Sequence, residues 1–352
     1  MTGDNLEIAP ADVDAAEFDA ILDIRFGREQ DPVFTSAINV DANELARDPL
    51  RFVNANDRVL VVCDIGLRSK TAVEGLRLAG VPASVSLAGG ADALRRMRAT
   101  SGPASLSADE VERYDRQIRL AGFGIEGQRN LAAATITVVG AGGLGCPALS
   151  YLATAGVGSI VVIDPDIVDL ANLHRQPLYA TDDVGTPKVK AAAARLHALN
   201  PEVVVSAVEE MVTEQNARTV IAGSDVVIDA TDNFAVRYAL NSACIALGGP
   251  MIYASVYGFE GQLAVFDSTV GPCYRCLFPV DPSGDAVLDC STVGVLGAVT
   301  GIIGSLQASA AIQIAAGVDH GLYGTLTLFN ARQGRFDQLS IAKRPNCQAC
   351  GE

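Results

Sequence analysis

The sequence predicts an α/β protein of two domains, and three observations lead to this fold class. Short apolar runs alternate with helix-like segments along most of the 352 residues, which is typical of parallel sheets covered by helices. A glycine-rich turn, GAGGLG (140–145), joins an apolar run to a helix-like segment. A turn-forming stretch, RATSGPASLSADE (98–110), interrupts the alternation. We therefore predict domains over 1–100 and 108–352, with a linker over 101–107.

The first domain is predicted to hold a small parallel sheet. Buried strands are expected where short apolar runs occur, over 20–25, 58–64 and 83–90. Between the last two runs, residues 69–80 predict a helix that ends at Gly80. This alternation of strand and helix favours parallel pairing of the strands.

The second domain repeats the alternation on a larger scale. Ser107 and Glu110 have the spacing of a capping box, which predicts a helix opening over 107–120. The predicted strands cover 135–140, 159–164, 202–208, 225–232, 251–258, 261–267 and 324–330. The predicted helices cover 143–156, 187–200, 213–222, 233–247 and 293–317. The order of these elements predicts a larger sheet with helices on it.

The composition excludes several classes of function. The net charge of −15 argues against a nucleic-acid-binding surface, which is normally basic. The N-terminal stretch is acidic and has no apolar core, so we expect no signal peptide and a cytoplasmic protein. The uncharged segment 293–317 is long enough to span a membrane, but it contains Ser, Thr and Gln and lacks a basic flank. We predict a buried helix there and no membrane association.

The glycine-rich turn has the spacing of a nucleotide-binding loop. Gly140, Gly142 and Gly145 form G-x-G-x-x-G, with Gly143 between them. Glycines allow a tight turn and close approach to a phosphate, and the helix that follows offers free amides. Asp164 ends the next predicted strand, where it can accept a hydrogen bond from a ribose hydroxyl. The pattern predicts an adenine nucleotide such as NAD, whereas the absence of G-x-x-x-x-G-K-[ST] excludes a P-loop.

Charged residues near the predicted strand ends favour a triphosphate over NAD. A triphosphate needs Lys, Arg and a metal ion to offset its negative charges. Asn172 and Arg175 follow Asp164 closely, and Lys188 begins a helix. Asp232, in the stretch DATDN, follows a strand and could hold Mg²⁺ through water. The same set includes Asp229, Arg113, Arg116 and Arg119.

Four of the eight cysteines form two C-x-x-C pairs, Cys273 with Cys276 and Cys347 with Cys350. Two such pairs can supply four thiolates in a tetrahedron, which is a closed structural Zn²⁺ site. No helix is predicted after the second pair, which argues against a redox motif. We predict a structural zinc ion that ties the C-terminal segment to its domain and takes no part in chemistry.

Together these motifs resemble the MoeB/ThiF family, the prokaryotic relatives of ubiquitin-activating enzymes. The resemblance covers the second domain through RYDRQI, GAGGLG, NLHRQ, DATDN, EGQLAVF, PCYRC and the final C-x-x-C. It implies a Rossmann-like domain with a mixed sheet and a structural zinc. It also implies an enzyme that uses ATP and Mg²⁺ to adenylate the C-terminal glycine of a ubiquitin-like sulfur carrier ending in Gly-Gly.

The resemblance also implies roles for single residues. Arg116 would reach into the site of a partner subunit, which implies a homodimer, and Asp232 would be linked to Mg²⁺. Arg116, Arg175, Lys188 and the metal would neutralise charge as a carboxylate attacks the α-phosphate. The residues implied to bind the nucleotide are Gly140, Gly142, Gly143, Gly145, Asp164, Asn172, Arg175, Lys188 and Asp232.

Four cysteines lie outside the C-x-x-C pairs, and their sequence contexts differ. Cys290 occupies the position of the family's crossover-loop cysteine, which is implied either to form a covalent intermediate or to be dispensable. Cys146 and Cys244 lie in helix-like segments with apolar neighbours, and we interpret both as packing residues. Cys63 ends an apolar run and is followed by a glycine, an arginine and a serine.

Residues 20–95 resemble a rhodanese domain through LDIR, SAINV, VVCDIGLRS and SLAGGADAL. In that family the cysteine that corresponds to Cys63 carries a persulfide. Its loop amides, the start of the next helix and Arg68 would stabilise a sulfur anion. Cys63 is therefore interpreted as a reactive thiol rather than a core residue.

Several functional hypotheses follow from these assignments. The leading one is adenylation of a sulfur carrier, followed by sulfur transfer from a Cys63 persulfide to give a thiocarboxylate. The alternatives are adenylation with a non-catalytic docking module at the N-terminus, an NAD-dependent oxidoreductase and a non-catalytic scaffold. Enzymes of this kind serve molybdopterin, thiamin, cysteine, thiolated-tRNA and secondary-metabolite pathways, among which the sequence does not choose.

Overall fold

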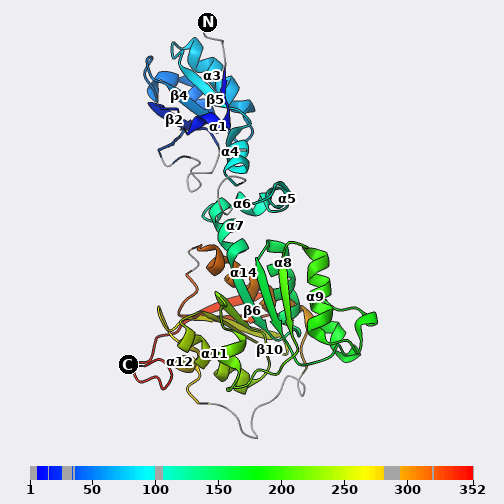
Figure 1. The fold of residues 1–352 in the computed structure, drawn as a ribbon. Coiled ribbons are helices and arrows are strands. Elements are labelled where there is room, and N and C mark those ends of the chain that lie inside the picture. Colours follow the sequence, from blue (N-terminus) through cyan, green and yellow to red (C-terminus); the bar gives the residue numbers. More distant parts are fainter. Residues whose placement is uncertain are drawn as a thin grey trace. The chain divides into compact units, whose positions relative to one another are not determined.

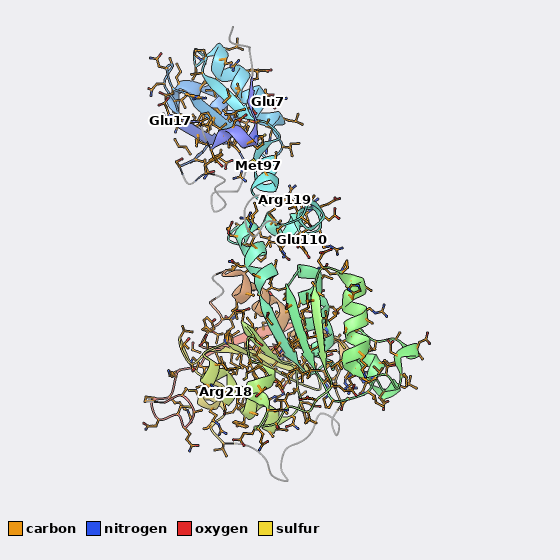
Figure 2. All side chains as sticks on the ribbon, viewed as in Figure 1. Glu7, Glu17, Met97, Glu110, Arg119 and Arg218 are labelled. Carbon is orange, nitrogen blue, oxygen red and sulfur yellow. The ribbon has the colours of Figure 1, made fainter. Side chains whose placement is uncertain are left out.

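The chain forms two compact units, residues 1–129 and 130–352 (Figure 1). The structure, a computed structural model, describes residues 6–14, 16–25, 34, 36–99, 106–280, 294–318 and 321–351. The predicted linker lies almost wholly outside these residues, so the boundary at 101–107 stays a prediction. Charged side chains such as those of Glu17 and Arg218 are exposed at the surface (Figure 2).

The first unit is built on a five-stranded parallel sheet with the order β1-β5-β4-β2-β3. Its strands are β1 (Glu7–Ile8), β2 (Ala20–Asp23), β3 (Ile38–Asn39), β4 (Val59–Val62) and β5 (Ser84–Leu87). The three predicted strands are confirmed, and every residue of β4 is buried, as its apolar run predicts. The two-residue strands β1 and β3 were not predicted, because two residues carry no periodicity.

Helices cover both faces of this sheet. They are α1 (Pro10–Val13), α2 (Ala42–Arg47), α3 (Leu67–Leu78) and α4 (Gly90–Ala99), with a 3-10 turn over Pro49–Arg51. Alternate residues of β4 face opposite sides: Val59 and Val61 pack with α2 and α3, whereas Leu60 and Val62 pack with α1 and α4. The predicted helix over 69–80 is confirmed as α3, and Gly80 follows it with φ of 94°.

Three short helices follow: α5 (Ala108–Arg113), α6 (Asp115–Ile118) and α7 (Gly124–Ala133). The capping box that opens α5 is confirmed, because the Glu110 amide donates to Ser107 Oγ at 3.2 Å and the Ser107 amide donates to Glu110 Oε2 at 2.7 Å. One continuous helix over 107–120 was wrong. Tyr114, whose ring is buried, has φ of −99° and ψ of 9° and separates α5 from α6.

The second unit is built on an eight-stranded mixed sheet with the order β13-β12-β11-β10-β9-β6-β7-β8. Pairing is parallel from β10 through β8 and antiparallel from β10 to β13. Its strands are β6 (Thr135–Val139), β7 (Ser159–Ile163), β8 (Val204–Val208), β9 (Val226–Asp229), β10 (Met251–Tyr257), β11 (Glu260–Phe266), β12 (Thr325–Asn330) and β13 (Arg335–Ser340). All seven predicted strands are confirmed. The edge strand β13 was not predicted, because five of its six residues are exposed and no apolar alternation marks it.

Helices cover both faces of the mixed sheet as well. α14 (Gly297–Ala316), α8 (Gly145–Ala155) and α9 (Lys188–Leu199) cover one face, and α11 (Phe234–Leu247) covers the other with α10 (Ala217–Val220) and α12 (Tyr274–Leu277). Two 3-10 turns lie over Leu170–Arg175 and Thr181–Asp183. The helix predicted over 213–222 is reduced to α10, because Thr213 and Asn216 cap a turn: the Thr213 amide donates to Asn216 Oδ1 at 2.7 Å.

α14 is long and apolar enough to cross a membrane by length and composition. The structure places it instead against the sheet, in contact with β9, β10 and β11. Gln307 on this helix is fully buried and donates from Nε2 to the carbonyls of Asp229, at 2.7 Å, and Ile252, at 3.2 Å. The helix is therefore part of the core of the second unit, as predicted.

The packing of α14 on α8 depends on Gly304, where a Cβ atom would overlap the Leu144 carbonyl and lie 2.6 Å from Pro147 Cγ. We expect Gly304→Ala to lower the free energy of unfolding by about 1–3 kcal/mol through overpacking. The control is Gly301→Ala on the same helix, where a Cβ atom meets nothing within 4 Å. That change should be neutral or stabilising by up to about 1 kcal/mol. Thermal unfolding measures both, and equal melting temperatures would contradict the packing argument.

Candidate functional site

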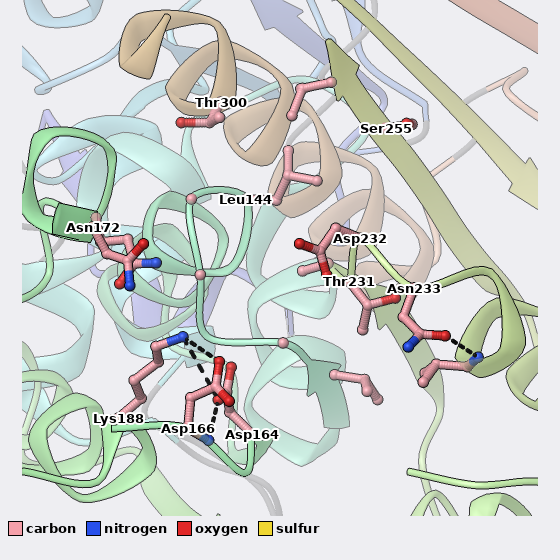
Figure 3. A pocket seen from close by; sticks show the side chains of 18 of the residues that line it. Leu144, Asp164, Asp166, Asn172, Lys188, Thr231, Asp232, Asn233, Ser255 and Thr300 are labelled. Atoms are coloured by element: carbon pink, nitrogen blue, oxygen red, sulfur yellow. Dashed lines mark hydrogen bonds and ion pairs between the residues drawn. The ribbon is translucent and has the colours of Figure 1, made fainter. Parts of the chain in front are cut away.

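A pocket of about 1060 Å³ lies at the carboxyl ends of β6, β7, β9 and β10 (Figure 3). β6 pairs with β7, the next strand of this sheet along the chain, on one side and with β9 on the other. The strand order therefore reverses at β6, where the pocket lies. Parallel α/β sheets bind ligands at such a point. The lining includes most of the predicted site residues: Gly140, Gly142, Gly143, Asp164, Asn172, Arg175, Lys188 and Asp232.

The glycine-rich turn forms one wall of the pocket. Gly140 has φ of 97°, and a Cβ atom there would lie 2.6 Å from the Ala230 carbonyl. A Cβ atom on Gly145 would overlap the Gly140 carbonyl, whereas one on Gly142 meets nothing closer than 3.6 Å. Gly140 and Gly145 are therefore required by the turn and by helix–strand packing. Gly142 leaves open the space in which a phosphate could approach the backbone.

Asp164 holds this turn in place. Its Oδ2 accepts from the Ala141 amide at 2.7 Å, and its Oδ1 accepts from the Asp166 amide at 2.8 Å. Burial raises the pKa of Asp164, and the positive charge of Lys188 opposes that shift. The Tyr179 hydroxyl donates to the Ala141 carbonyl at 2.8 Å, so both the amide and the carbonyl of Ala141 are hydrogen-bonded.

Two cationic side chains line another wall of the pocket. Lys188 begins α9 and is almost fully buried, with Nζ 2.8 Å from Asp166 Oδ2 and 3.9 Å from Asp164 Oδ1 (Figure 3). Arg175 donates from Nη2 to Asn172 Oδ1 at 2.7 Å. Its Nη1 lies 2.8 Å from Nε2 of His174, which also lines the pocket. These cations can attract an anionic ligand to this wall.

The loop after β9 forms the wall opposite Lys188. Asp229 is fully buried, and burial raises the pKa of its carboxyl group while Arg237 opposes that shift. Asp232 is exposed and points into the pocket (Figure 3). Among the described residues no cation lies within ion-pair distance of Asp232. An open carboxylate across from two cations fits the oxygen ligand that Mg²⁺ prefers.

Sequence reasoning did not identify Arg237 as part of this site. It lines the pocket although only 3% of its surface is exposed, and its Nε lies 3.3 Å from Asp229 Oδ2. The available signal was an arginine at the start of an otherwise apolar helix, in NFAVRYAL. Other lining residues that were not predicted include Gln176, Glu210, Met211, Ser255, Tyr257 and Thr300.

The two C-x-x-C pairs come together in the second unit. The four Sγ atoms lie within 4.8 Å of one another, with contacts of 3.6 Å between Cys273 and Cys347 and 3.5 Å between Cys276 and Cys350. A tetrahedron with Zn–S bonds of about 2.3 Å requires S···S distances of about 3.8 Å. Burial opposes ionisation of Cys347, but amides of Ala349 and Cys350 outweigh it and lower its pKa to about 6. The cluster has the ligand set and the close spacing that a structural Zn²⁺ site requires.

Two further cysteines of the second unit, Cys146 and Cys244, are inert by position. Cys146 in α8 and Cys244 in α11 are buried, and burial raises the pKa of each thiol to about 12. This agrees with their interpretation as packing residues. Cys290 lies outside the described residues, so its predicted role stays a prediction.

Cys63 follows β4 in the first unit and is 1% exposed. Its Sγ accepts from the amides of Gly66, at 3.1 Å, and Ser69, at 3.3 Å, and lies 3.2 Å from Ser69 Oγ. The loop amides therefore face the sulfur, as predicted. The Arg68 guanidinium instead pairs with Asp64 at 2.7 Å.

The predicted arginines before β6 lie in the first unit. Arg116 is on α6 with an exposed side chain, and Arg119 pairs with Asp115 at 3.0 Å. The assignment of Arg116 to a partner subunit's site stays a prediction.

The ThiF family model matches residues 114–349, which is more than half of the chain. The protein belongs to the ThiF family. The match contains the residues that line the pocket and three of the four clustered cysteines, whereas Cys350 lies one residue beyond it. Residues 1–113, including Cys63, lie outside it.

Two curated proteins resemble this ThiF-family chain closely. A sulfur carrier protein adenylyltransferase of Thermus thermophilus is 45% identical over 249 residues, which are 69% of this chain and 92% of the relative. An adenylyltransferase and sulfurtransferase MOCS3 of Culex quinquefasciatus is 47% identical over 248 residues, 70% of this chain. That alignment covers 57% of the longer MOCS3 protein.

A solved structure shows the same fold. The crystal structure of E. coli MccB with ATP superposes with a TM-score of 0.61 over 68% of this chain and 75% of that one. The sequences are 22% identical, so this likeness bears on the fold alone.

The ThiF-family unit should lose its metal when the cysteine cluster is broken. We expect Cys350→Ala to remove the zinc and to lower the melting temperature by about 10 °C, since structural zinc contributes folding free energy. Metal analysis of purified protein and thermal unfolding measure the two effects. Cys244→Ala, at a buried thiol outside the cluster, should retain the metal. Equal metal content in wild type and Cys350→Ala would contradict the assignment.

Proposed function

We propose that this protein adenylates the C-terminal glycine of a ubiquitin-like sulfur carrier, using ATP and Mg²⁺. The observation that carries the proposal is the pocket itself, which joins a glycine-rich turn, a carboxylate placed for a ribose and two cations facing an open carboxylate. The name of the Thermus relative supports the substrate class. Adenylation requires no nucleophile from the protein, because the carboxylate of the carrier attacks the nucleotide itself.

The chemistry requires charge neutralisation rather than a reactive side chain. A carboxylate oxygen of the carrier attacks the α-phosphorus of ATP, the bond from that phosphorus to the β-phosphate oxygen breaks, and pyrophosphate leaves. The product is a mixed anhydride, the acyl adenylate. Lys188 and Arg175 lie where they would offset the negative charge that builds on the phosphates. Asp164 would hold the ribose and Asn172 would orient Arg175.

Asp232 would hold Mg²⁺, which, when bound, offsets phosphate charge and orients the leaving group. The ion pair with Asp166 orients Lys188 at the pocket wall, so its side chain would already be in place before the nucleotide binds. We further propose that the active form is a homodimer in which Arg116 completes the partner's site. A cytoplasmic location and a Gly-Gly-ending carrier complete the proposal.

We propose a second activity for the first unit, because two amides and a hydroxyl surround Cys63 Sγ as a sulfur anion requires. The outer sulfur of a Cys63 persulfide would attack the acyl carbon, and AMP would leave with its oxygen. A second thiolate, for which Cys290 is the candidate, would then attack Cys63 Sγ. This releases the thiocarboxylate and leaves a disulfide for a dithiol to reduce. The printed name of MOCS3 supports this order.

The adenylation step is tested at Asp232. We expect Asp232→Asn to lower ATP–pyrophosphate exchange, measured with a Gly-Gly-ending carrier, by about 100-fold or more, because the substitution removes the charge that would hold the metal. Asp337→Asn, at a carboxylate on β13 outside the pocket, is the matched control and should retain exchange. Exchange at the wild-type rate in Asp232→Asn would reject the assigned role.

The sulfur step is tested at Cys63. With thiosulfate as donor, we expect Cys63→Ala to abolish replacement of the carrier's terminal oxygen by sulfur, measured by intact mass, while pyrophosphate exchange stays within about twofold. Exchange serves as the control for folding of the second unit, and the thermal unfolding of the variant is the control for the first. A variant that still forms thiocarboxylate would favour the alternative, in which the first unit is a docking module.

A further inference from the structure

Thr231, the residue that precedes Asp232, is held at its amide and at its carbonyl by a buried ion pair. The Asp229 carboxylate accepts at Oδ1 from the Thr231 amide, at 3.0 Å, and from the Thr231 hydroxyl, at 2.7 Å. Arg237 donates from Nη2 to the Thr231 carbonyl at 2.6 Å. The Thr231 carbonyl and the Asp232 amide nitrogen belong to the same peptide group. The two charged groups therefore fix the backbone next to the Cα atom of Asp232.

Arg237 is itself held without freedom to move. The guanidinium lies over the rings of Phe234, at 5.3 Å, and Tyr253, at 5.1 Å, and its Nη2 also reaches the Ala254 carbonyl at 3.3 Å. Its Nε lies 3.3 Å from Asp229 Oδ2 as an ion pair, without the angle of a hydrogen bond. A planar guanidinium can make these contacts at once, and an ammonium group cannot.

The third support comes from α14. Gln307 donates to the Asp229 carbonyl, so the end of β9 is held by a helix on one face of the sheet and by Arg237 of α11 on the other. Burying an ion pair is costly, and a core of this kind could be filled by apolar residues instead. The pair has a use because it holds Thr231, the residue directly before the open carboxylate of Asp232.

We propose that Arg237, with Asp229, is a positioning residue that sets the Asp232 carboxylate for the metal–nucleotide complex. The inference rests on the proposed adenylation site and deepens it. Loss of the arginine would let the Thr231 peptide rotate, and Asp232 would then hold the metal less tightly. Binding of the nucleotide without metal, which would depend on the glycine-rich turn and Asp164, would be weakened less.

The test is equilibrium binding of ATP by calorimetry, once with Mg²⁺ and once with excess EDTA. The measured quantity is the dissociation constant in EDTA divided by the dissociation constant in Mg²⁺. This ratio reports the gain in affinity that the metal provides. We expect Arg237→Lys, which keeps the charge, to reduce this gain by about tenfold, the usual cost of losing a group that orients a metal ligand. Its affinity without metal should fall by much less than its affinity with metal.

Arg25→Lys is the matched control. Arg25 is also a buried arginine paired with an aspartate, at 2.6 Å from Asp23, but it lies in the first unit. It should leave the ratio unchanged. Asp232→Ala should also lower the ratio. The variant that carries both substitutions should have the same ratio as Asp232→Ala alone, because both changes act on one metal ligand.

The outcomes separate the two proposals. A wild-type protein whose ATP affinity does not respond to Mg²⁺ would reject the metal role of Asp232. A metal-dependent wild type with the same ratio in Arg237→Lys would overturn the positioning role alone. Where Arg237→Lys does not fold, Asp229→Asn decides, since it removes the charge paired with Arg237, and an unchanged ratio there overturns the inference.

Discussion

Two buried carboxylates, at the ends of the strands β7 and β9 that flank β6, hold the pocket loops in place. Asp164 follows β7 and binds the amide of Ala141 in the turn after β6, whereas Asp229 ends β9 and binds the amide of Thr231 in its own loop. A buried carboxylate is costly unless amides and a cation compensate it. Each of these has both, with Lys188 beside Asp164 and Arg237 beside Asp229. The loops that form the pocket walls thus depend on charge satisfied inside the protein.

Features that depend on local sequence were predictable. The turn at Gly140 requires a positive φ, which glycine supplies, and the spacing of Ser107 and Glu110 is sufficient for a capping box. The continuous apolar run of β4 is that of a strand buried on both faces. The spacing of Cys273 and Cys276, and of Cys347 and Cys350, also predicted that the pairs could meet.

Features that depend on tertiary neighbours were not predictable. Arg237 is an ordinary arginine in the sequence and becomes part of the site only because α11 packs its first turn against β9 and β10. Arg68 was expected near Cys63, but Asp64, one helical turn earlier, is its closer partner. The break between α5 and α6 occurs at Tyr114, a buried residue outside helical geometry, which no periodicity shows.

The cysteine cluster joins points 74 residues apart along the chain, and α14, β12 and β13 lie within the loop it closes. β13 is an exposed edge strand, the kind of element from which a sheet frays. With a metal ion in the cluster, the chain beyond β13 would be anchored beside α12, and fraying from that edge would be confined to the strand itself. Slow amide exchange in β12 would therefore report metal occupancy, although the metal lies outside that strand.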